Sequence, residues 1–442
     1  MKPLARVLQN GFTALLCCGA LVGLPATAHA AKPKAAPAAS AKAAEAAGPR
    51  EIRLGHQLDP DRAEALQKLV TRFNERSKDY RIVLTALADG DTPNMAIVQG
   101  DDLERYFSGK VGYKPLSTVM RDAGVPLQTL KPPATMTRSL VDGKGQLLAL
   151  PVALSTPVMY FNRNEFKRVG LNPDALPKTW FDLQQVLGQL VDAGSQCPYT
   201  VSQPGRVMIE NTSAWHNEPV AARQAKGERA AFNGMLQVKH IAMMASWHRA
   251  HYLRTFDADS EAEGKFAAGE CAVIAAPSSS WTEFRRKANF EVGIAPLPYH
   301  DDFAGGGAPQ NTLAEGGAMW VSAGKPAVEY KGVAQFVAFW LQPENQVAWE
   351  RESGYLPLNR AGVFAAQSDL LAPDLDNVRV AVAQLTAKPA TADSSATSIT
   401  GRSRVMSILD EELRAVWADR KPAKEALDTA VVRVQSLMTG VR

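Results

Sequence analysis

Cysteine is scarce in this chain, with four in 442 residues, and two of the four, Cys17 and Cys18, lie in the apolar amino-terminal stretch. So low a content excludes a small scaffold that depends on several disulfides. The remaining pair is Cys197 and Cys271. The sequence allows a disulfide between them in an oxidising compartment, and two separate buried thiols are the alternative.

An excess of one charge sign is also lacking from the main part of the chain. The formal charge is +4, but residues 1–50 contain six basic side chains against the single acid Glu45. The rest of the chain therefore carries about −1, which excludes the strongly basic profile expected of a nucleic-acid or anionic-membrane binder.

Catalytic motifs are missing as well. There is no G-x-S-x-G, no H-E-x-x-H, no Walker loop and no G-x-G-x-x-G after a strand. His240, His248 and His251 fall in one predicted helix, but His240 and His251 are about 16 Å apart at 1.5 Å per residue, too far to share a metal. We interpret these histidines as a solvated helix face, and we expect neither a cofactor nor an enzymatic activity.

A long apolar run occurs at the amino terminus, where it reads as a targeting signal. Lys2 and Arg6 precede the apolar stretch Gly11–Leu24, and Ala28-His29-Ala30 is a small-x-small cleavage site. Residues 1–30 therefore predict a secretory signal peptide and a periplasmic location. Residues 31–50, nearly all alanine, proline and lysine, have no bulky apolar side chain to bury, so we expect a disordered tether.

From Glu51 onward, strand and helix patterns alternate. The segment EIRLGH reads as a strand, Asp59 and Pro60 can begin a helix, and YRIVLTAL reads as the next strand. Thr179 and Asp182 form a capping-box pattern ahead of another amphipathic stretch. The alternation predicts an α/β fold with mainly parallel strands, and 442 residues are too many for a single core.

Seven motifs then occur in a characteristic order. They are STPVMYFNRNEFKRVGLNPDALPKTWFDL, ENTSAWHNEP, VKHIAM, GECAV, GGAMWV, PENQVAWERESGYLP and EALDTAV. Together they resemble the extracellular solute-binding proteins of ABC importers, and within that family those that bind sn-glycerol-3-phosphate. The resemblance extends from about residue 51 to residue 437.

The resemblance implies a two-lobed periplasmic-binding-protein fold (type II), in which each lobe is a mixed sheet flanked by helices and the ligand binds in a cleft between the lobes. The amino-terminal lobe would comprise residues 51–157 plus about 315–357. The carboxy-terminal lobe would comprise about 158–314 plus 358–442. The segment PVALSTPVMYFN, residues 151–162, resembles the first crossing between lobes.

The resemblance also nominates ligand-binding residues. Ser155 would direct a hydroxyl into the cleft, Gly317 would let the backbone approach the ligand, and Tyr355 would form a wall. Asp102, or its neighbour Asp101, stands where the family has a glutamate that holds ligand hydroxyls.

The remaining family positions depart from the pattern. A second serine falls on Pro277, with Ser278 adjacent. Two pocket tryptophans fall on Gln203 and Arg206, and a pocket tyrosine lies in a helix that is missing between YRIVLTAL and the next strand. The family's phosphate-binding arginine falls on Ser398, so that Arg402 or Arg404 could replace it only after a local shift.

These departures change the expected ligand. Arg206 is a candidate anion contact, while Glu315 would oppose a dianion if it faces the cleft and is otherwise a solvated loop residue. A glycerophosphodiester with a cationic head therefore becomes an alternative to glycerol-3-phosphate. A carbohydrate ligand, stacked on Trp281, Trp320 or Tyr355, is a further alternative, as is a ligand-free sensor that kept the fold.

The sequence thus predicts a monomeric periplasmic substrate-binding protein that binds a small molecule non-covalently. Its expected partners are the permease subunits of an ABC importer and their ATPase.

Overall fold

The computed structural model describes residues 48–99, 103–107, 112–125, 127, 140–142, 144–224, 227–303, 309–357, 372–395 and 401–438. All of them belong to one compact unit, Gly48–Arg442. The expected signal peptide lies outside the described residues, as does most of the tether. Arg50 already belongs to the first strand, one residue earlier than the sequence indicates. Among the described helices, none is long and apolar enough to cross a membrane.

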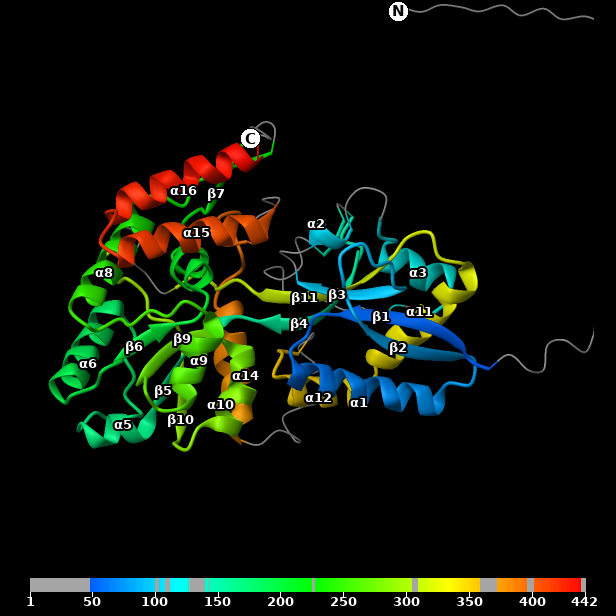
Figure 1. Ribbon diagram of the computed structural model, residues 1–442, viewed down its shortest axis with the longest axis horizontal. Coiled ribbons are helices and arrows are strands. Elements are labelled where there is room, and N and C mark those ends of the chain that lie inside the picture. Colours follow the sequence, from blue (N-terminus) through cyan, green and yellow to red (C-terminus); the bar gives the residue numbers. More distant parts are fainter. Residues whose placement is uncertain are drawn as a thin grey trace, which may run out of the picture. The chain divides into compact units, whose positions relative to one another are not determined.

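The first sheet has five strands in the order β2-β1-β3-β11-β4 (Figure 1). The strands are β1 (Arg50–His56), β2 (Tyr80–Ala86), β3 (Met95–Gln99), β4 (Leu150–Ser155) and β11 (Glu315–Val321). Strands β2 and β3 run parallel to β1, but β11 is antiparallel to both β3 and β4. Strands β1, β2, β3 and β4 therefore run in the same direction, as the alternation predicts, and β11, which comes from far along the chain, makes the sheet mixed.

Helices cover this sheet and share its apolar core. They are α1 (Pro60–Arg76), α2 (Leu103–Tyr106), α3 (Leu116–Asp122), α11 (Ala327–Trp340) and α12 (Pro343–Ser353). Helix α1 begins as predicted: the Asp59 side chain accepts a hydrogen bond from the Arg62 amide, and Pro60 occupies the first turn. The apolar face of α1, with Leu66, Leu69 and Phe73, packs into the core.

The second sheet has four strands in the order β10-β5-β9-β6. The strands are β5 (Pro157–Asn162), β6 (Tyr199–Val201), β9 (Val273–Pro277) and β10 (Val292–Ala295). Strand β9 lies antiparallel to β5 and parallel to β6, so this sheet is also mixed. A separate hairpin pairs β7 (Ala221–Arg223) with β8 (Glu228–Ala230).

The elements that pack around the second sheet are mostly helices. They are α5 (Arg163–Arg168), α6 (Trp180–Asp192), the π-helix η2 (Gly205–Asn211), α7 (Thr212–Trp215), α8 (Met235–Arg249), α9 (Asp259–Ala267), η3 (Ser278–Ser280), α10 (Trp281–Lys287), α14 (Ala372–Leu385), α15 (Arg402–Trp417) and α16 (Ala423–Met438). The capping box predicted at Thr179 and Asp182 is confirmed. Helix α8 ends before His251, which takes a positive φ of 60°.

His240 corrects another expectation, because it does not lie on a solvated helix face. The side chain is fully buried, and its Nδ1 lies 3.1 Å from His300 Nε2. The ring also packs against Trp180, with 4.8 Å between centroids. The core around the second sheet therefore holds a pair of buried imidazoles, which the helical pattern of the sequence does not reveal.

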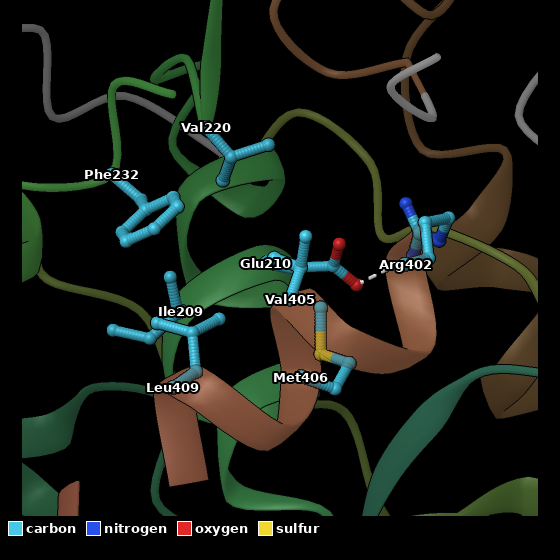
Figure 2. Close-up of a pocket in the computed structure, with 8 residues that line it drawn as sticks. All are labelled: Ile209, Glu210, Val220, Phe232, Arg402, Val405, Met406 and Leu409. Carbon is cyan, nitrogen blue, oxygen red and sulfur yellow. Dashed lines mark hydrogen bonds and ion pairs between the residues drawn. The ribbon is translucent and has the colours of Figure 1, made fainter. Parts of the chain in front are cut away.

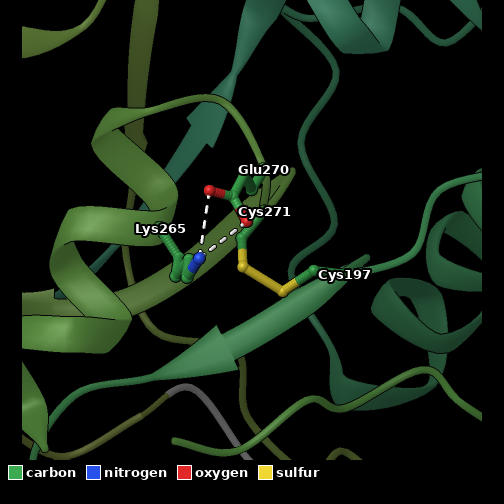
Figure 3. Close-up of a disulfide and its surroundings, with 4 residues drawn as sticks. All are labelled: Cys197, Lys265, Glu270 and Cys271. Carbon is green, nitrogen blue, oxygen red and sulfur yellow. Dashed lines mark hydrogen bonds and ion pairs between the residues drawn. A yellow bond between two sulfur atoms is a disulfide. The ribbon is translucent and has the colours of Figure 1, made fainter.

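Cys197 and Cys271 are joined by a disulfide with a Cα–Cα distance of 4.5 Å (Figure 3). Cys197 precedes β6 and Cys271 precedes β9, two strands that lie side by side. The bond thus closes the second sheet near the start of both strands. An ion pair between Lys265 and Glu270 lies beside it.

The chain passes from the first sheet to the second through a single residue, Thr156, between β4 and β5. Its hydroxyl donates to Thr312 Oγ1 at 2.8 Å and to the Leu313 carbonyl at 3.0 Å. Thr312 and Leu313 lie just before β11, so the passage at Thr156 is hydrogen-bonded to the segment that returns the chain to the first sheet. The residues nominated for ligand binding lie around this crossing.

Candidate functional site

Two of the nominated serines meet at the crossing. Ser155 Oγ, at the end of β4, lies 3.2 Å from Ser278 Oγ, which follows β9. The Ser279 amide donates to Ser155 Oγ at 3.2 Å, and the Thr156 amide donates to Ser278 Oγ at 3.3 Å. The structure therefore brings together two hydroxyls from different sheets and fixes both by backbone hydrogen bonds.

Two glycines in β11 pack closely against neighbouring backbone beside this pair. At Gly317, nominated for a close approach of backbone to ligand, an added Cβ would meet the Val98 carbonyl oxygen at 3.2 Å. At Gly316, with φ 136°, an added Cβ would fall 1.4 Å from the Ala153 carbonyl oxygen. Gly316 is thus the position at which only glycine fits, and the backbone it approaches is that of β4.

Glu315 is placed only through its backbone. It pairs with Ser155 in the register between β11 and β4. The first residue of β11 therefore lies level with the serine pair. Its side chain lies outside the described part of the chain, as do Asp101 and Asp102.

Tyr355 lies just beyond α12, and its partner is an arginine that the sequence did not single out. The Arg62 guanidinium carbon lies 4.9 Å from the centre of the Tyr355 ring. Arg62 Nε donates to the Ser353 carbonyl at 3.2 Å, and Nη2 donates to the Ser279 carbonyl at 2.9 Å. Arg62 thus joins the first turn of α1 to the segment that carries Ser278.

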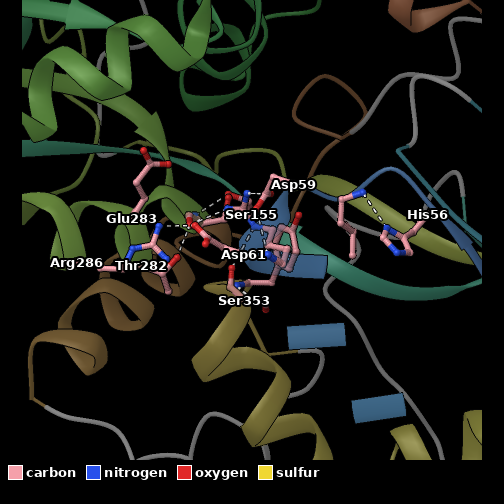
Figure 4. A network of polar contacts seen from close by, with 12 residues as sticks. His56, Asp59, Asp61, Ser155, Thr282, Glu283, Arg286 and Ser353 are labelled. Atoms are coloured by element: carbon pink, nitrogen blue, oxygen red, sulfur yellow. Dashed lines mark hydrogen bonds and ion pairs between the residues drawn. The ribbon is translucent and has the colours of Figure 1, made fainter. Parts of the chain in front are cut away.

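Figure 4 shows the polar network around these contacts. Next to Arg62, Asp61 forms an ion pair with Arg286 of α10. The hydrogen bond from Arg286 lowers the pKa of the Asp61 carboxyl. Two consecutive residues of α1 therefore contact the η3–α10 segment. The Arg62 side chain donates to the Ser279 carbonyl, and the Asp61 carboxylate pairs with the Arg286 side chain.

The two arginines nominated for the ligand anion, Arg206 and Arg402, lie elsewhere and share one carboxylate. Arg402 Nη2 donates to Glu210 Oε2 at 2.9 Å, and Arg206 Nη1 lies 3.6 Å from the same oxygen. The Glu210 side chain is only 8% exposed. Each of these cations thus has a buried acid as a neighbour, which opposes binding of an anion there.

Figure 2 shows the pocket beside this ion pair. Apart from Glu210 and Arg402, its lining is apolar: Ile209, Val220, Phe232, Val405, Met406 and Leu409. Helix α15 supplies Arg402 and the π-helix η2 supplies Glu210, and π-helical segments are frequent at functional sites. The pocket does not include the serine pair, so the nominated residues fall into two groups.

A half-buried acid near the serine pair is a further residue that the sequence did not indicate. The Ser202 hydroxyl donates to Glu263 Oε1 at 2.7 Å. Burial is the main reason why the pKa of Glu263 is raised, and hydrogen bonds from Ser202 and Ser280 act in the opposite direction. An acid of this kind can accept hydrogen bonds from ligand hydroxyls and favours a cation over a second negative charge.

The aromatic residues considered for carbohydrate stacking are part of the core. Trp281 stacks on Tyr160, with 6.3 Å between centroids. Trp320 is buried against Tyr113. Neither ring therefore offers an open face. Tyr355 is likewise buried, with Arg62 over its ring and Trp349 packed at 6.0 Å between centroids.

Comparison with known proteins shows the family to which the chain belongs. The family model for bacterial extracellular solute-binding proteins matches residues 73–369. Over 407 residues, the chain is 33% identical to the sn-glycerol-3-phosphate-binding periplasmic protein UgpB of Yersinia enterocolitica, covering 88% of this chain and 92% of that protein. The chain belongs to the bacterial extracellular solute-binding protein family.

Two solved structures show that the fold is that of the maltose-binding type of this family. The structure of UgpB from Mycobacterium tuberculosis in complex with glycerophosphocholine has a TM-score of 0.70 and 18% identity, covering 89% of this chain and 99% of that one. Maltose-bound MalE3 of T. maritima has a TM-score of 0.66 and 15% identity, covering 88% of this chain and 99% of that one. The expected fold class is therefore confirmed.

Proposed function

We propose that this solute-binding protein binds sn-glycerol-3-phosphate or a glycerophosphodiester in the periplasm and delivers it to the permease of an ABC importer. The ligand is held by non-covalent contacts alone. The curated relatives with about a third of their residues identical support the ligand class, since they are named for binding sn-glycerol-3-phosphate. The substrate-binding role of the family supports the absence of catalysis.

The observation that carries the proposal is the serine pair at the crossing. Ser155 and Ser278 bring two buried hydroxyls from different sheets together. Ser279 links the pair to Arg62, because its amide donates to Ser155 Oγ and its carbonyl accepts from Arg62, whose guanidinium lies over the Tyr355 ring. Hydroxyl donors beside a guanidinium and an aromatic ring match a ligand with glycerol hydroxyls and an acidic phosphate.

Closure around the ligand would use the same crossing. We take the two lobes to be residues 51–157 with 315–357 and residues 158–314 with 358–442. Thr156 links them through one residue, which suits a hinge whose change in backbone angles is confined to few positions. The contacts of Asp61 and Arg62 with the η3–α10 segment would then form part of the closed state.

The distribution of charge favours a diester over a monoester. Arg206 and Arg402 lie apart from the serine pair and are offset by Glu210, while the half-buried Glu263 adds an acidic group near the pair. A phosphomonoester carries nearly two negative charges at neutral pH, whereas a diester carries one and its head group can be cationic. Fewer cations are therefore needed to hold a glycerophosphodiester.

The test is a binding screen of the purified protein by thermal shift and calorimetry. The panel contains glycerol-3-phosphate, glycerophosphocholine, glycerophosphoethanolamine and maltose. At a hundred times its dissociation constant, a specific ligand should raise the free energy of unfolding by about 2.7 kcal/mol. Stabilisation by a glycerol phosphate compound supports the proposal, whereas stabilisation by maltose alone indicates a carbohydrate binder, and no stabilisation by any of the four overturns it.

A further inference from the structure

The Arg62 side chain is held at the site in a way that leaves it able to bind a ligand. It has five N–H donors. Among the described residues, three of these have acceptors: the Ser353 carbonyl, the Ser279 carbonyl and the Asp59 carboxylate. One N–H on each terminal nitrogen remains, and the side chain is 23% exposed, so that a ligand can reach it.

The charge of Arg62 is also less neutralised than that of the other candidates. Two of its three acceptors are uncharged carbonyls, and its one carboxylate partner, Asp59, is 42% exposed and therefore well solvated. Arg206 and Arg402, by contrast, share the buried carboxylate of Glu210. An added anion would meet a buried carboxylate beside those two arginines, whereas the acids that act on Arg62 are the solvated Asp59 and, less strongly, Glu263.

The surroundings of Arg62 suit the proposed ligand. Its Nη2 bonds to the Ser279 carbonyl, while the amide of the same residue donates to Ser155 Oγ. Its guanidinium lies over the Tyr355 ring, which orients the planar group. A phosphate held by the guanidinium would therefore keep its glycerol hydroxyls close to the serine pair.

We propose that Arg62 receives the anionic group of the ligand and takes the role that the sequence comparison assigned to Arg402. The inference rests on the proposed function, since it concerns the same ligand. A phosphate oxygen is a stronger acceptor than a backbone carbonyl because it is charged, and the paired N–H groups of arginine fit two such oxygens. Lysine, a point charge, fits them less well.

The experiment measures dissociation constants of the purified protein by isothermal titration calorimetry, with glycerol-3-phosphate and glycerophosphocholine as probes. The variants are Arg62→Gln and Arg62→Lys, and the matched control is Arg121→Gln, which removes an exposed arginine from α3. Arg402→Gln tests the rival position. Circular dichroism and the melting temperature establish that each variant is folded.

We expect Arg62→Gln to raise the dissociation constant roughly 10- to 150-fold, as is typical for loss of a hydrogen bond to a charged group. Arg62→Lys should recover part of the affinity, and the control should bind as the wild type does. If Arg62→Gln does not fold, a weakening of severalfold in Arg62→Lys still supports the proposal, and unchanged affinity in that variant contradicts it.

Two other outcomes overturn the inference in distinguishable ways. If the wild type binds a probe and Arg62→Gln binds it equally well, or Arg402→Gln shows the larger loss, then Arg62 is not the anion ligand although the proposed function stands. If the wild type binds neither probe, the proposed function fails together with the inference.

Discussion

The hydroxyl oxygens of Ser155 and Ser278 lie 3.2 Å apart, although 123 residues separate the two serines. Each hydroxyl also accepts a backbone N–H from beside its partner, namely Ser279 and Thr156. The pair therefore links the end of β4 to the end of β9 while it presents the hydroxyls that we assign to ligand binding.

Replacing Ser155 with alanine should lower both ligand affinity and stability. The Ser279 amide would lose its acceptor in a buried position, which costs about 1–3 kcal/mol in the free energy of unfolding. Urea denaturation measures this loss, and calorimetry with glycerophosphocholine measures the affinity. An unchanged free energy of unfolding would show that the Ser279 amide finds another acceptor.

Gly316→Ala should destabilise the protein severely, because its Cβ would overlap the Ala153 carbonyl oxygen. The control is Gly324→Ala, which also has a positive φ, of 73°, but no atom within 4 Å of the new Cβ. The control should lose about 1–2 kcal/mol for the left-handed backbone alone. We expect Gly316→Ala to lose more than about 3 kcal/mol or to fail to fold, as measured by urea denaturation. Equal losses in the two variants would contradict the steric argument.

Reducing the disulfide should destabilise the part of the protein built around the second sheet. Cys197 and Cys271 are 74 residues apart in the sequence, and a cross-link closing such a long loop contributes about 4 kcal/mol in the chain-entropy model. The double variant Cys197→Ser, Cys271→Ser should show a loss of about 2–5 kcal/mol in urea denaturation. Adding a reductant should leave the double variant unaffected and lower the stability of the wild type, so a similar response of both proteins would argue against the bond.

Acidification should lower the free energy of unfolding, because the buried histidine pair resists protonation in the folded state. Burial above all, followed by the nearby His216 and Lys239, lowers the pKa of His300 to about 4. The unfolded chain binds a proton near pH 6.5 and the folded chain does not, so stability is lost as the pH falls below 6.5. This one group should cost about 2 kcal/mol between pH 7.5 and pH 5.

The comparison with His300→Gln isolates this contribution, because other groups act in the opposite sense. Burial raises the pKa of Asp410 to about 6. Its protonation on acidification therefore removes the cost of a buried negative charge and stabilises the folded state. Urea denaturation at both pH values should show that the variant loses less stability on acidification than the wild type. The same pH dependence in both proteins would refute the role of His300.

Much of the local structure could be predicted from the sequence, because short-range chemistry determines it. Asp59 with Pro60, and Thr179 with Asp182, mark helix starts through contacts within one turn. Arg62 could not be found in this way. An arginine in a capped first turn is typical of an exposed residue, and its real partners, Ser279 and Ser353, are 217 and 291 residues away.

The same limit applies to two other residues. The place of Arg402 near a family motif does not reveal its hydrogen bond to Glu210, which lies 192 residues earlier. His240 was assigned to a solvated face because the helical pattern shows only the partners on the same helix, whereas His300 comes from another segment. Pairings between distant segments decide which charged or polar side chains face a ligand.

The insertion of β11 between β3 and β4 has a consequence for how the protein can be made. Among the described strands, β4 at the edge of the first sheet pairs with β11 alone, so Leu150–Ser155 has no sheet partner until residues 315–321 have been delivered. When the chain emerges from its amino terminus, during synthesis or export, all strands of the second sheet emerge between β4 and β11. The apolar strand β4 therefore stays unpaired, either exposed or bound by a chaperone, until β11 has emerged. A fragment that ends at the crossing should not complete the first sheet, and the two halves of the molecule cannot be expressed separately as consecutive pieces.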